Sequence, residues 1–89
     1  MKNVYFFYGS ECPNCMIMEK LVDRLLEEEG ILIKKMECWH NTENENLMVS
    51  LDDSDECCGG VPFFYNENTG KSICGEVNYK ELRIWAESK

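Results

Sequence analysis

Two cysteines, Cys12 and Cys15, lie between a segment with the pattern of a strand and a segment with the pattern of a helix. Before them, Val4 to Tyr8 form an unbroken run of β-branched and aromatic residues, which is typical of a strand buried on both faces. After them the apolar residues recur at helical spacing, and Pro13 in the first turn costs no hydrogen bond. Unpaired N–H groups and the helix dipole favour a thiolate at the start of a helix. This junction therefore predicts dithiol–disulfide chemistry at Cys12 and Cys15.

The remaining segments can be assigned from their periodicity and their turn residues. Strands are expected at 3–8, 31–39, 63–65 and 71–74. Helices are expected over 13–29, from 41 or 42 to about 51, and after 78. Gly30 is the expected C-cap of the first helix, whose buried stripe includes Leu25 and Leu26, and Asn78 with Glu81 predicts a capping box. This order predicts one compact three-layer α/β domain over residues 1–89.

Composition limits the classes of protein to which this chain can belong. The 89 residues are 44% hydrophobic, which suits one folded domain and argues against disorder. The net charge of −8 argues against nucleic acid and anionic membranes as partners, because both attract clustered Lys and Arg. No apolar run approaches the ~20 residues of a membrane-spanning helix, and the segment before Gly9 is too short for a signal peptide. We expect a cytoplasmic monomer without a cofactor.

Six cysteines in 89 residues is a high number. In a secreted chain of this length they would predict three structural disulfides. Without a signal peptide, and with regular helix and strand patterns, catalytic or metal-binding cysteines are the better interpretation. A soft metal or an iron–sulfur cluster would use thiolates from the set Cys12, Cys15, Cys57 and Cys58.

The element order, with Cys12-Pro13-Asn14-Cys15 after the first strand and Val61-Pro62 before the third, resembles the thioredoxin superfamily over essentially the whole chain. The short segment before the first cysteine is similar to that of glutaredoxin-sized members. The resemblance implies a thioredoxin-like fold, in which a four-stranded mixed sheet has helices on both faces. It also implies a thiol–disulfide oxidoreductase that reduces protein disulfides through a mixed-disulfide intermediate and is served by an unidentified reductase.

The resemblance also assigns roles to individual residues. Cys12 is expected to be the attacking thiol, exposed at the positive end of the helix, and Cys15 the shielded resolving thiol. Pro62 is expected to be a cis-proline packed against the dithiol, and the backbone N–H and C=O of Val61 to bind an extended substrate segment. The residues expected to contact substrate are Pro13, Asn14, Val61, Pro62 and Gly75.

Two positions differ from the pattern of thioredoxins. Glu11 precedes Cys12 where thioredoxins have tryptophan, and a neighbouring carboxylate opposes a thiolate. Phe6 lies at about the position where thioredoxins bury a proton-transferring acid under the resolving cysteine. We therefore expect a Cys12 thiol that is less acidic than the motif alone suggests.

The strand directions predict where the other four cysteines lie. Parallel first and second strands would bring Cys38 to the same edge of the sheet as the dithiol, and the third and fourth strands, antiparallel, would bring the rest there. The candidate auxiliary thiols are Cys38, Cys57, Cys58 and Cys74. Burial as small apolar residues is the simplest interpretation of Cys38 and Cys74. For Cys57 and Cys58, in an acidic glycine-rich loop, a second redox pair or a relay to the dithiol is the alternative, whereas a disulfide between them would be strained.

Three further features have simple structural interpretations. His40 is expected to face solvent and not to be a ligand. Trp39 is expected either to shield the dithiol or to lie half-buried at the end of its strand. The acidic segment 52–56 predicts a solvated loop, with selection of a basic partner as the alternative.

Two alternatives to an enzyme stay open. The first is the metal or iron–sulfur binding module, and the second is a non-enzymatic interaction domain on the same scaffold.

Overall fold

The sheet is built around its first strand. In the computed structural model, which describes residues 3–51 and 60–87, β1 (Val4–Tyr8) pairs in parallel with β2 (Lys34–Glu37) and antiparallel with β3 (Phe63–Asn66). β4 (Lys71–Cys74) pairs antiparallel with β3 and completes the order β2-β1-β3-β4. The predicted four-stranded mixed sheet is therefore confirmed.

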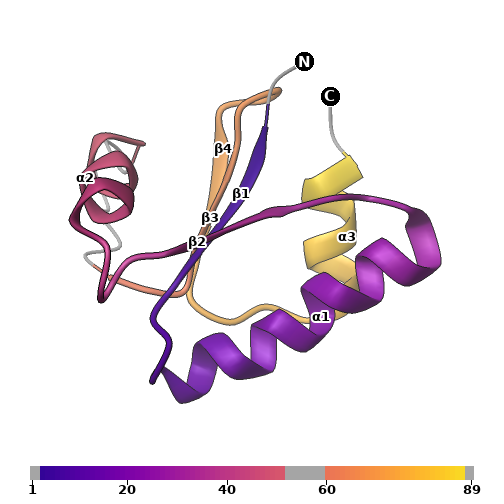
Figure 1. The fold of residues 1–89 in the computed structure, drawn as a ribbon. Helices are drawn as coiled ribbons and strands as arrows, with labels where there is room; N and C mark the ends of the chain where they lie inside the picture. Colours follow the sequence, from indigo (N-terminus) through magenta and orange to yellow (C-terminus); the bar gives the residue numbers. More distant parts are fainter. Residues whose placement is uncertain (1–2, 52–59, 88–89) are drawn as a thin grey trace.

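Three helices cover the two faces of the sheet (Figure 1). α1 (Pro13–Glu29) and α3 (Tyr79–Glu87) lie on one face, and α2 (Thr42–Leu51) lies on the other. The sheet is thus the middle one of three layers, as the order of elements predicts. None of the helices in the described residues is long and apolar enough to cross a lipid bilayer.

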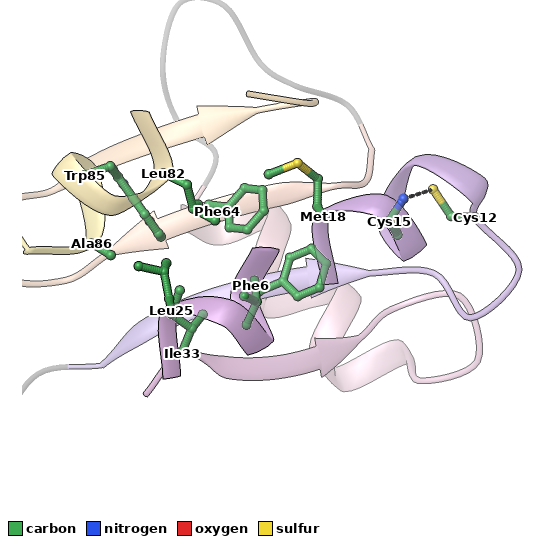
Figure 2. Close-up of a cluster of buried hydrophobic side chains, with 11 residues drawn as sticks. Phe6, Cys12, Cys15, Met18, Leu25, Ile33, Phe64, Leu82, Trp85 and Ala86 are labelled. Carbon is green, nitrogen blue, oxygen red and sulfur yellow. Dashed lines mark hydrogen bonds between the residues drawn. The ribbon is translucent and has the colours of Figure 1, made fainter. Parts of the chain in front are cut away.

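The face covered by α1 and α3 holds the larger core (Figure 2). Phe6 and Phe64 stack with their ring centroids 4.8 Å apart, and the ring of Trp85 lies edge-on to Phe64 at 5.5 Å. The two helices add fully buried aliphatic side chains: Met18, Leu25 and Leu82. Full burial of such a side chain stabilises a fold by roughly 1.5–3 kcal/mol. This core fixes α1, and the two cysteines lie at the start of α1.

The face covered by α2 holds a smaller core. The strands contribute Tyr5, Phe7 and Phe63, and Cys38 joins them from the end of β2. Met48 is the buried residue that α2 contributes to this cluster, and Leu47 and Leu51 pack against it partly buried. Because β1 faces a core on each side, its residues are apolar on both, which explains the unbroken apolar run in the sequence.

The helix ends agree closely with the sequence prediction. α1 spans the expected residues, and Gly30 (φ 67°) ends it as a left-handed C-cap whose N–H binds the carbonyls of Leu25 and Leu26. Asn78 begins α3, because its side-chain oxygen accepts the Glu81 N–H at 2.8 Å.

Two expectations about β2 and α1 are wrong. β2 covers Lys34–Glu37 instead of 31–39, because Ile31 donates its N–H to the Leu25 carbonyl and so belongs to the end of α1. Leu26 is 48% exposed and does not belong to the buried stripe. That stripe is narrower than expected and consists of Cys15, Met18, Val22 and Leu25.

Candidate functional site

Cys12 is the N-cap residue of α1. Its backbone is extended (φ −86°, ψ 114°), its N–H donates to the Gly9 carbonyl at 3.0 Å, and its carbonyl accepts the Met16 N–H at 3.1 Å. Its sulfur accepts the N–H of Cys15 at 3.2 Å, a group that has no carbonyl partner within the helix (Figure 2). The capping geometry therefore holds the Cys12 sulfur at the positive end of the helix dipole.

The burial of Cys12 differs from the sequence prediction. The sequence predicts an exposed thiol, but only 6% of Cys12 is accessible to solvent, against 2% of Cys15. The capping hydrogen bond explains the difference, because it turns the sulfur toward the first turn of α1 instead of toward water. Both cysteines of the dithiol are therefore buried, and the prediction of an exposed Cys12 is wrong.

Cys15 is held in its thiol form. Burial, hydrogen bonding to Cys12 and the negative charge of Cys12 raise the pKa of Cys15 to about 12, although the backbone N–H of Gly9 acts in the opposite direction. A buried protonated thiol is inert until its proton is removed. The two sulfurs thus have different environments, since one receives a helix N–H and the other keeps its own proton.

The segment that leads to the dithiol is fixed by the carboxylate of Glu37, at the end of β2. This carboxylate accepts the backbone N–H groups of Ser10 at 2.9 Å, Trp39 at 3.1 Å and His40 at 2.8 Å. Desolvation acts to raise the pKa of Glu37, but the three N–H groups outweigh it and the pKa is lowered. The Glu37 carbonyl also accepts a side-chain N–H of Asn44 at 2.8 Å. One residue therefore joins the loops after β1 and β2 to α2.

Nothing in the local sequence pattern predicts this role of Glu37. A glutamate at the end of a strand is most simply solvated. Its value as an acceptor depends on the parallel pairing of β1 with β2, which places Tyr8 opposite Glu37 and brings the two following loops together. The available signal was its position directly before Cys38 and Trp39, at the end of the sheet where the dithiol lies.

Glu11, the residue before Cys12, is hydrogen-bonded to His40, and the two form an ion pair when the imidazole is protonated. The Nε2 atom of His40 and the Oε1 atom of Glu11 are 2.7 Å apart, and the side chains are 65% and 61% exposed. Hydrogen bonding to His40 lowers the pKa of Glu11, and the same hydrogen bond raises the pKa of His40. His40 faces solvent, as predicted. The carboxylate that precedes Cys12 is paired with an imidazole, a contact that the sequence does not predict.

Trp39 lies over Gly9, at the start of the loop that leads to the dithiol. A Cβ atom on Gly9 would overlap the indole, at 2.7 Å from the Cγ atom and closer still to two other ring atoms. Trp39 is nevertheless 53% exposed, so its outer side is free to solvent. Only glycine fits at position 9 while the indole keeps this place.

Cys38 lies at the same end of the sheet as the dithiol, as predicted. It is 2% exposed, packs in the core under α2, and donates its backbone N–H to the Tyr8 carbonyl at 2.8 Å. Burial and the nearby charges of Glu37 and Glu45 raise the pKa of Cys38 to about 11. Its charge also contributes to the raised pKa of Cys15. Cys38 is therefore a buried free thiol that is neutral near neutral pH.

The residues before β3 have several of the features expected of a substrate-binding segment. The Val61–Pro62 peptide bond is cis, as predicted. Val61 packs against both cores, including the one that contains Cys12 and Cys15. Within the described part of the chain, the backbone N–H and C=O of Val61 have no hydrogen-bond partner. Contact between Pro62 and the dithiol stays a prediction.

The other predicted substrate contacts lie around this segment and on α1. Gly75 has a left-handed backbone (φ 85°) and donates its N–H to the Pro62 carbonyl at 2.9 Å. Pro13 and Asn14 are exposed on the first turn of α1. The structure thus leaves the outer surface of the dithiol loop accessible and ties the end of β4 to the cis-proline.

Cys74 differs from the prediction. It lies opposite Phe63 at the expected end of the sheet, but it is exposed and disulfide-bonded, not a buried free thiol. Its strand, β4, is at the edge of the sheet, where less of the molecule covers it. The free thiols among the described residues are Cys12, Cys15 and Cys38.

The metal alternative can be examined only for part of its residues. Over residues 3–51 and 60–87, no group of three or more His, Cys, Asp or Glu side chains is arranged to hold a metal ion. Cys57 and Cys58 of the predicted thiolate set lie outside these ranges, as does the acidic segment 52–56. The site that the structure describes is therefore the dithiol with its surrounding loops.

Comparison with known proteins identifies no relative, since no family model, no curated protein and no solved structure matches this chain. The functional interpretation therefore depends on the residues and on their geometry.

Proposed function

We propose that this chain is a thiol–disulfide oxidoreductase with a thioredoxin-like arrangement, in which Cys12 attacks and Cys15 resolves. The observation that carries the proposal is the asymmetry of the two sulfurs. Both thiols are buried, but the Cys12 sulfur accepts a helix N–H at 3.2 Å, whereas the pKa of Cys15 is raised to about 12. A thiolate is the nucleophile in disulfide exchange, and the capping position stabilises it at Cys12.

The reaction would proceed in two exchanges. The Cys12 thiolate attacks one sulfur of a substrate disulfide, so that a mixed disulfide forms, the substrate bond breaks, and the first substrate sulfur leaves as a thiolate. Cys15 then loses its proton and attacks the Cys12 sulfur. The mixed disulfide breaks, the second substrate sulfur leaves, and a Cys12–Cys15 disulfide remains. Two electrons have passed from the dithiol to the substrate.

Formation of the mixed disulfide also prepares Cys15 for its step. Two of the causes that raise the pKa of Cys15, its hydrogen bond to Cys12 and the charge of Cys12, disappear once the Cys12 sulfur is bonded to substrate. Burial, the largest cause, persists. The only buried polar side chain among the described residues is Asn66, and Phe6 is fully buried, so no carboxylate lies in the core to take the proton. We expect the second exchange to be the slower one.

The segment at Val61 would orient the substrate. Its N–H and C=O groups, which have no partner over residues 3–51 and 60–87, suit an extended peptide that pairs with the backbone, as in strand addition to a sheet edge. Pro13, Asn14 and Gly75 would complete the contact surface. This mode of binding recognises main chain, so it would accept different protein disulfides, and an unidentified reductase would regenerate the dithiol.

The test compares three cysteine variants in the reduced protein with a disulfide-bonded protein substrate. Cys12→Ser should abolish reduction, and Cys15→Ser should accumulate a mixed disulfide with the substrate, visible by mass spectrometry. Cys38→Ser is the matched control, because Cys38 is also a buried free thiol, and it should retain most of the activity. Activity that survives in Cys12→Ser would overturn the proposal.

The metal-binding alternative predicts a different result from the same preparation. Protein purified without oxygen would hold stoichiometric zinc, copper or iron, and Cys12 and Cys15 would resist alkylation until the metal was removed. The non-enzymatic alternative predicts thiols that alkylate normally but reduce no substrate. Structural disulfides are rare in the cytosol, where disulfides are usually catalytic or redox-sensing. Because Cys74 is disulfide-bonded, the cytoplasmic location stays a prediction.

A further inference from the structure

The Glu11–His40 pair has no part in the two exchanges, yet one of its members directly precedes the attacking cysteine in the chain. Glu11 is the residue before Cys12, so its Cα is about 3.8 Å from that of Cys12. Because adjacent residues carry the carboxylate and the sulfur, their separation is comparable to the Debye length of about 8–10 Å. Any charge on an incoming disulfide will interact with the pair.

We propose that the Glu11–His40 pair sets which disulfides reach Cys12, favouring cationic over anionic ones, and that this preference strengthens when His40 loses its proton. The proposal rests on the proposed function and names the class of substrate for it. Its chemistry is the two-electron exchange described above, and the pair changes the local concentration of the charged disulfide, not the bonds that form or break.

The charges that act on His40 are few and of one sign. Glu11 acts from the loop between β1 and α1, and Glu37 acts from the end of β2. Glu43 and Glu45 lie in the first turn of α2, and Glu45 acts on Cys38. Among the described residues, no Lys or Arg charge acts on the pKa of His40 in either direction. Loss of the imidazole proton therefore leaves an uncompensated acidic site.

The direction of the pH dependence follows from the two titrations. Glu11 stays ionised over the neutral range, because its pKa is lowered from an already acidic value. The pKa of His40 is raised from its ordinary value of 6.5. Below that raised pKa the imidazolium compensates Glu11, and above it Glu11 stands uncompensated. Preference for cationic disulfides should therefore increase as the pH rises through the titration of His40.

The structure also holds the pair in a fixed place. The Glu37 carboxylate accepts the backbone N–H groups of Ser10, which directly precedes Glu11, and of His40 itself. The pair is therefore presented at a defined distance from the dithiol, although its side chains are mostly exposed. Because charges this exposed are screened by solvent, the expected effect on the rate for a charged disulfide is a few-fold change.

The experiment measures reduction of three small disulfides by the fully reduced protein: cystamine, which is cationic, hydroxyethyl disulfide, which is neutral, and dithiodipropionate, which is anionic. The quantity of interest is the ratio of the cystamine rate to the dithiodipropionate rate, from about pH 5.5 to about pH 8. Both probes meet the same Cys12 sulfur, so the fraction of thiolate cancels in the ratio. In the native sequence the ratio should rise with pH by about two- to fivefold.

Three variants separate the contributions. His40→Asn should abolish the rise and keep the ratio at its high-pH level. Glu11→Gln should lower the ratio at every pH and move the midpoint of the rise to lower pH, because His40 loses the partner that raises its pKa. Glu27→Gln is the matched control, with the same charge change about 22 Å further along α1, and it should behave like the native sequence.

The failure of this proposal can be distinguished from failure of the proposed function. If the native protein reduces the neutral disulfide but His40→Asn and Glu11→Gln give the same ratios as Glu27→Gln, the pair has no such role and the oxidoreductase assignment stands. If no disulfide is reduced, the oxidoreductase assignment fails. Alkylation of Cys12 by iodoacetate relative to iodoacetamide then tests the pair alone, because it should decrease with pH in the native sequence and not in His40→Asn.

Discussion

The two faces of the sheet hold free cysteines in different settings. On the α1/α3 face, Cys12 and Cys15 belong to the larger core, where stacked aromatic rings and fully buried aliphatic side chains from both helices meet. On the α2 face, Cys38 belongs to a smaller core to which α2 contributes Met48 as its one buried residue. The dithiol is therefore positioned by the better-packed half of the molecule, and the third thiol is covered by the thinner half.

The stability of the fold and the surroundings of the dithiol therefore depend on different parts of the molecule. The large core fixes the geometry of the α1 N-terminus, which the exchange reaction needs to stay constant. The loops that adjust the surroundings of the dithiol, around Gly9 and Trp39, lie between the two halves and are held by hydrogen bonds and one indole contact. Substitutions in the large core should therefore affect folding most, and substitutions in the loops should affect the site with less effect on folding.

The largest expected effect compares one methionine on each face. Met18→Ala removes a fully buried side chain from the large core and should lower the free energy of unfolding by about 3–5 kcal/mol. Met48→Ala removes the same side chain from the α2 face, where Met48 is 7% exposed, and should cost about 2 kcal/mol. Urea denaturation of the reduced proteins measures both, and an equal or larger loss for Met48→Ala would contradict the comparison.

The same pair of variants also tests what covers Cys38. Cys38 and Met48 line one hollow of about 210 Å³ on the α2 face. Shortening Met48 should speed the alkylation of Cys38 in the folded protein, whereas Met18→Ala should leave it unchanged at matched stability. Equal acceleration in both variants would indicate that Cys38 reacts only through global unfolding.

A smaller effect is expected at the contact between the two loops. Gly9→Ala places a methyl group where the Trp39 indole lies and should destabilise the fold by about 1–3 kcal/mol. Trp39→Ala should relieve that clash, so the double variant should lose less stability than the sum of the single ones. Urea denaturation of the four proteins gives this coupling, and strict additivity would show that the indole does not occupy this place in solution.

Much of the fold follows from short-range features of the sequence. The bounds of α1, its Gly30 cap and the Asn78 cap of α3 depend on residues within one or two turns of each other, and the structure agrees with all three. The periodicity of the sequence does not predict where β2 begins. Ile31, expected in the strand, instead donates its N–H to the Leu25 carbonyl in the turn after α1. Local patterns thus predicted where helices begin and end better than where a short edge strand does.

The sequence predicts which residues form the candidate site, but it predicts little of what surrounds them. Cys12 and Cys15 were identified from spacing alone, but the burial of Cys12 depends on a rotamer that the cap selects. The bonds from Glu37 to Ser10 and from His40 to Glu11 join residues 27 and 29 positions apart. Such contacts require the parallel pairing of β1 and β2, and no short-range pattern encodes them. The sequence therefore names Glu11 as a neighbour of the dithiol, but its pairing with His40 and the contacts of Glu37 are known only from the structure.

The smallest expected effect is on the pH dependence of folding stability, to which a buried thiol on each face contributes. A thiol whose pKa is higher in the folded than in the unfolded chain binds more protons when folded, so its contribution to stability is complete below its ordinary pKa of 9.0 and decreases as the pH rises through the folded value. That value is about 11 for Cys38 and about 12 for Cys15. Stability of the reduced protein should therefore fall above pH 9.0, and each of Cys38→Ala and Cys15→Ala should make the fall less steep. Urea midpoints of native and variant proteins at stepped pH measure the slopes, and a slope unchanged in Cys38→Ala would mean that the α2 face admits water to this thiol.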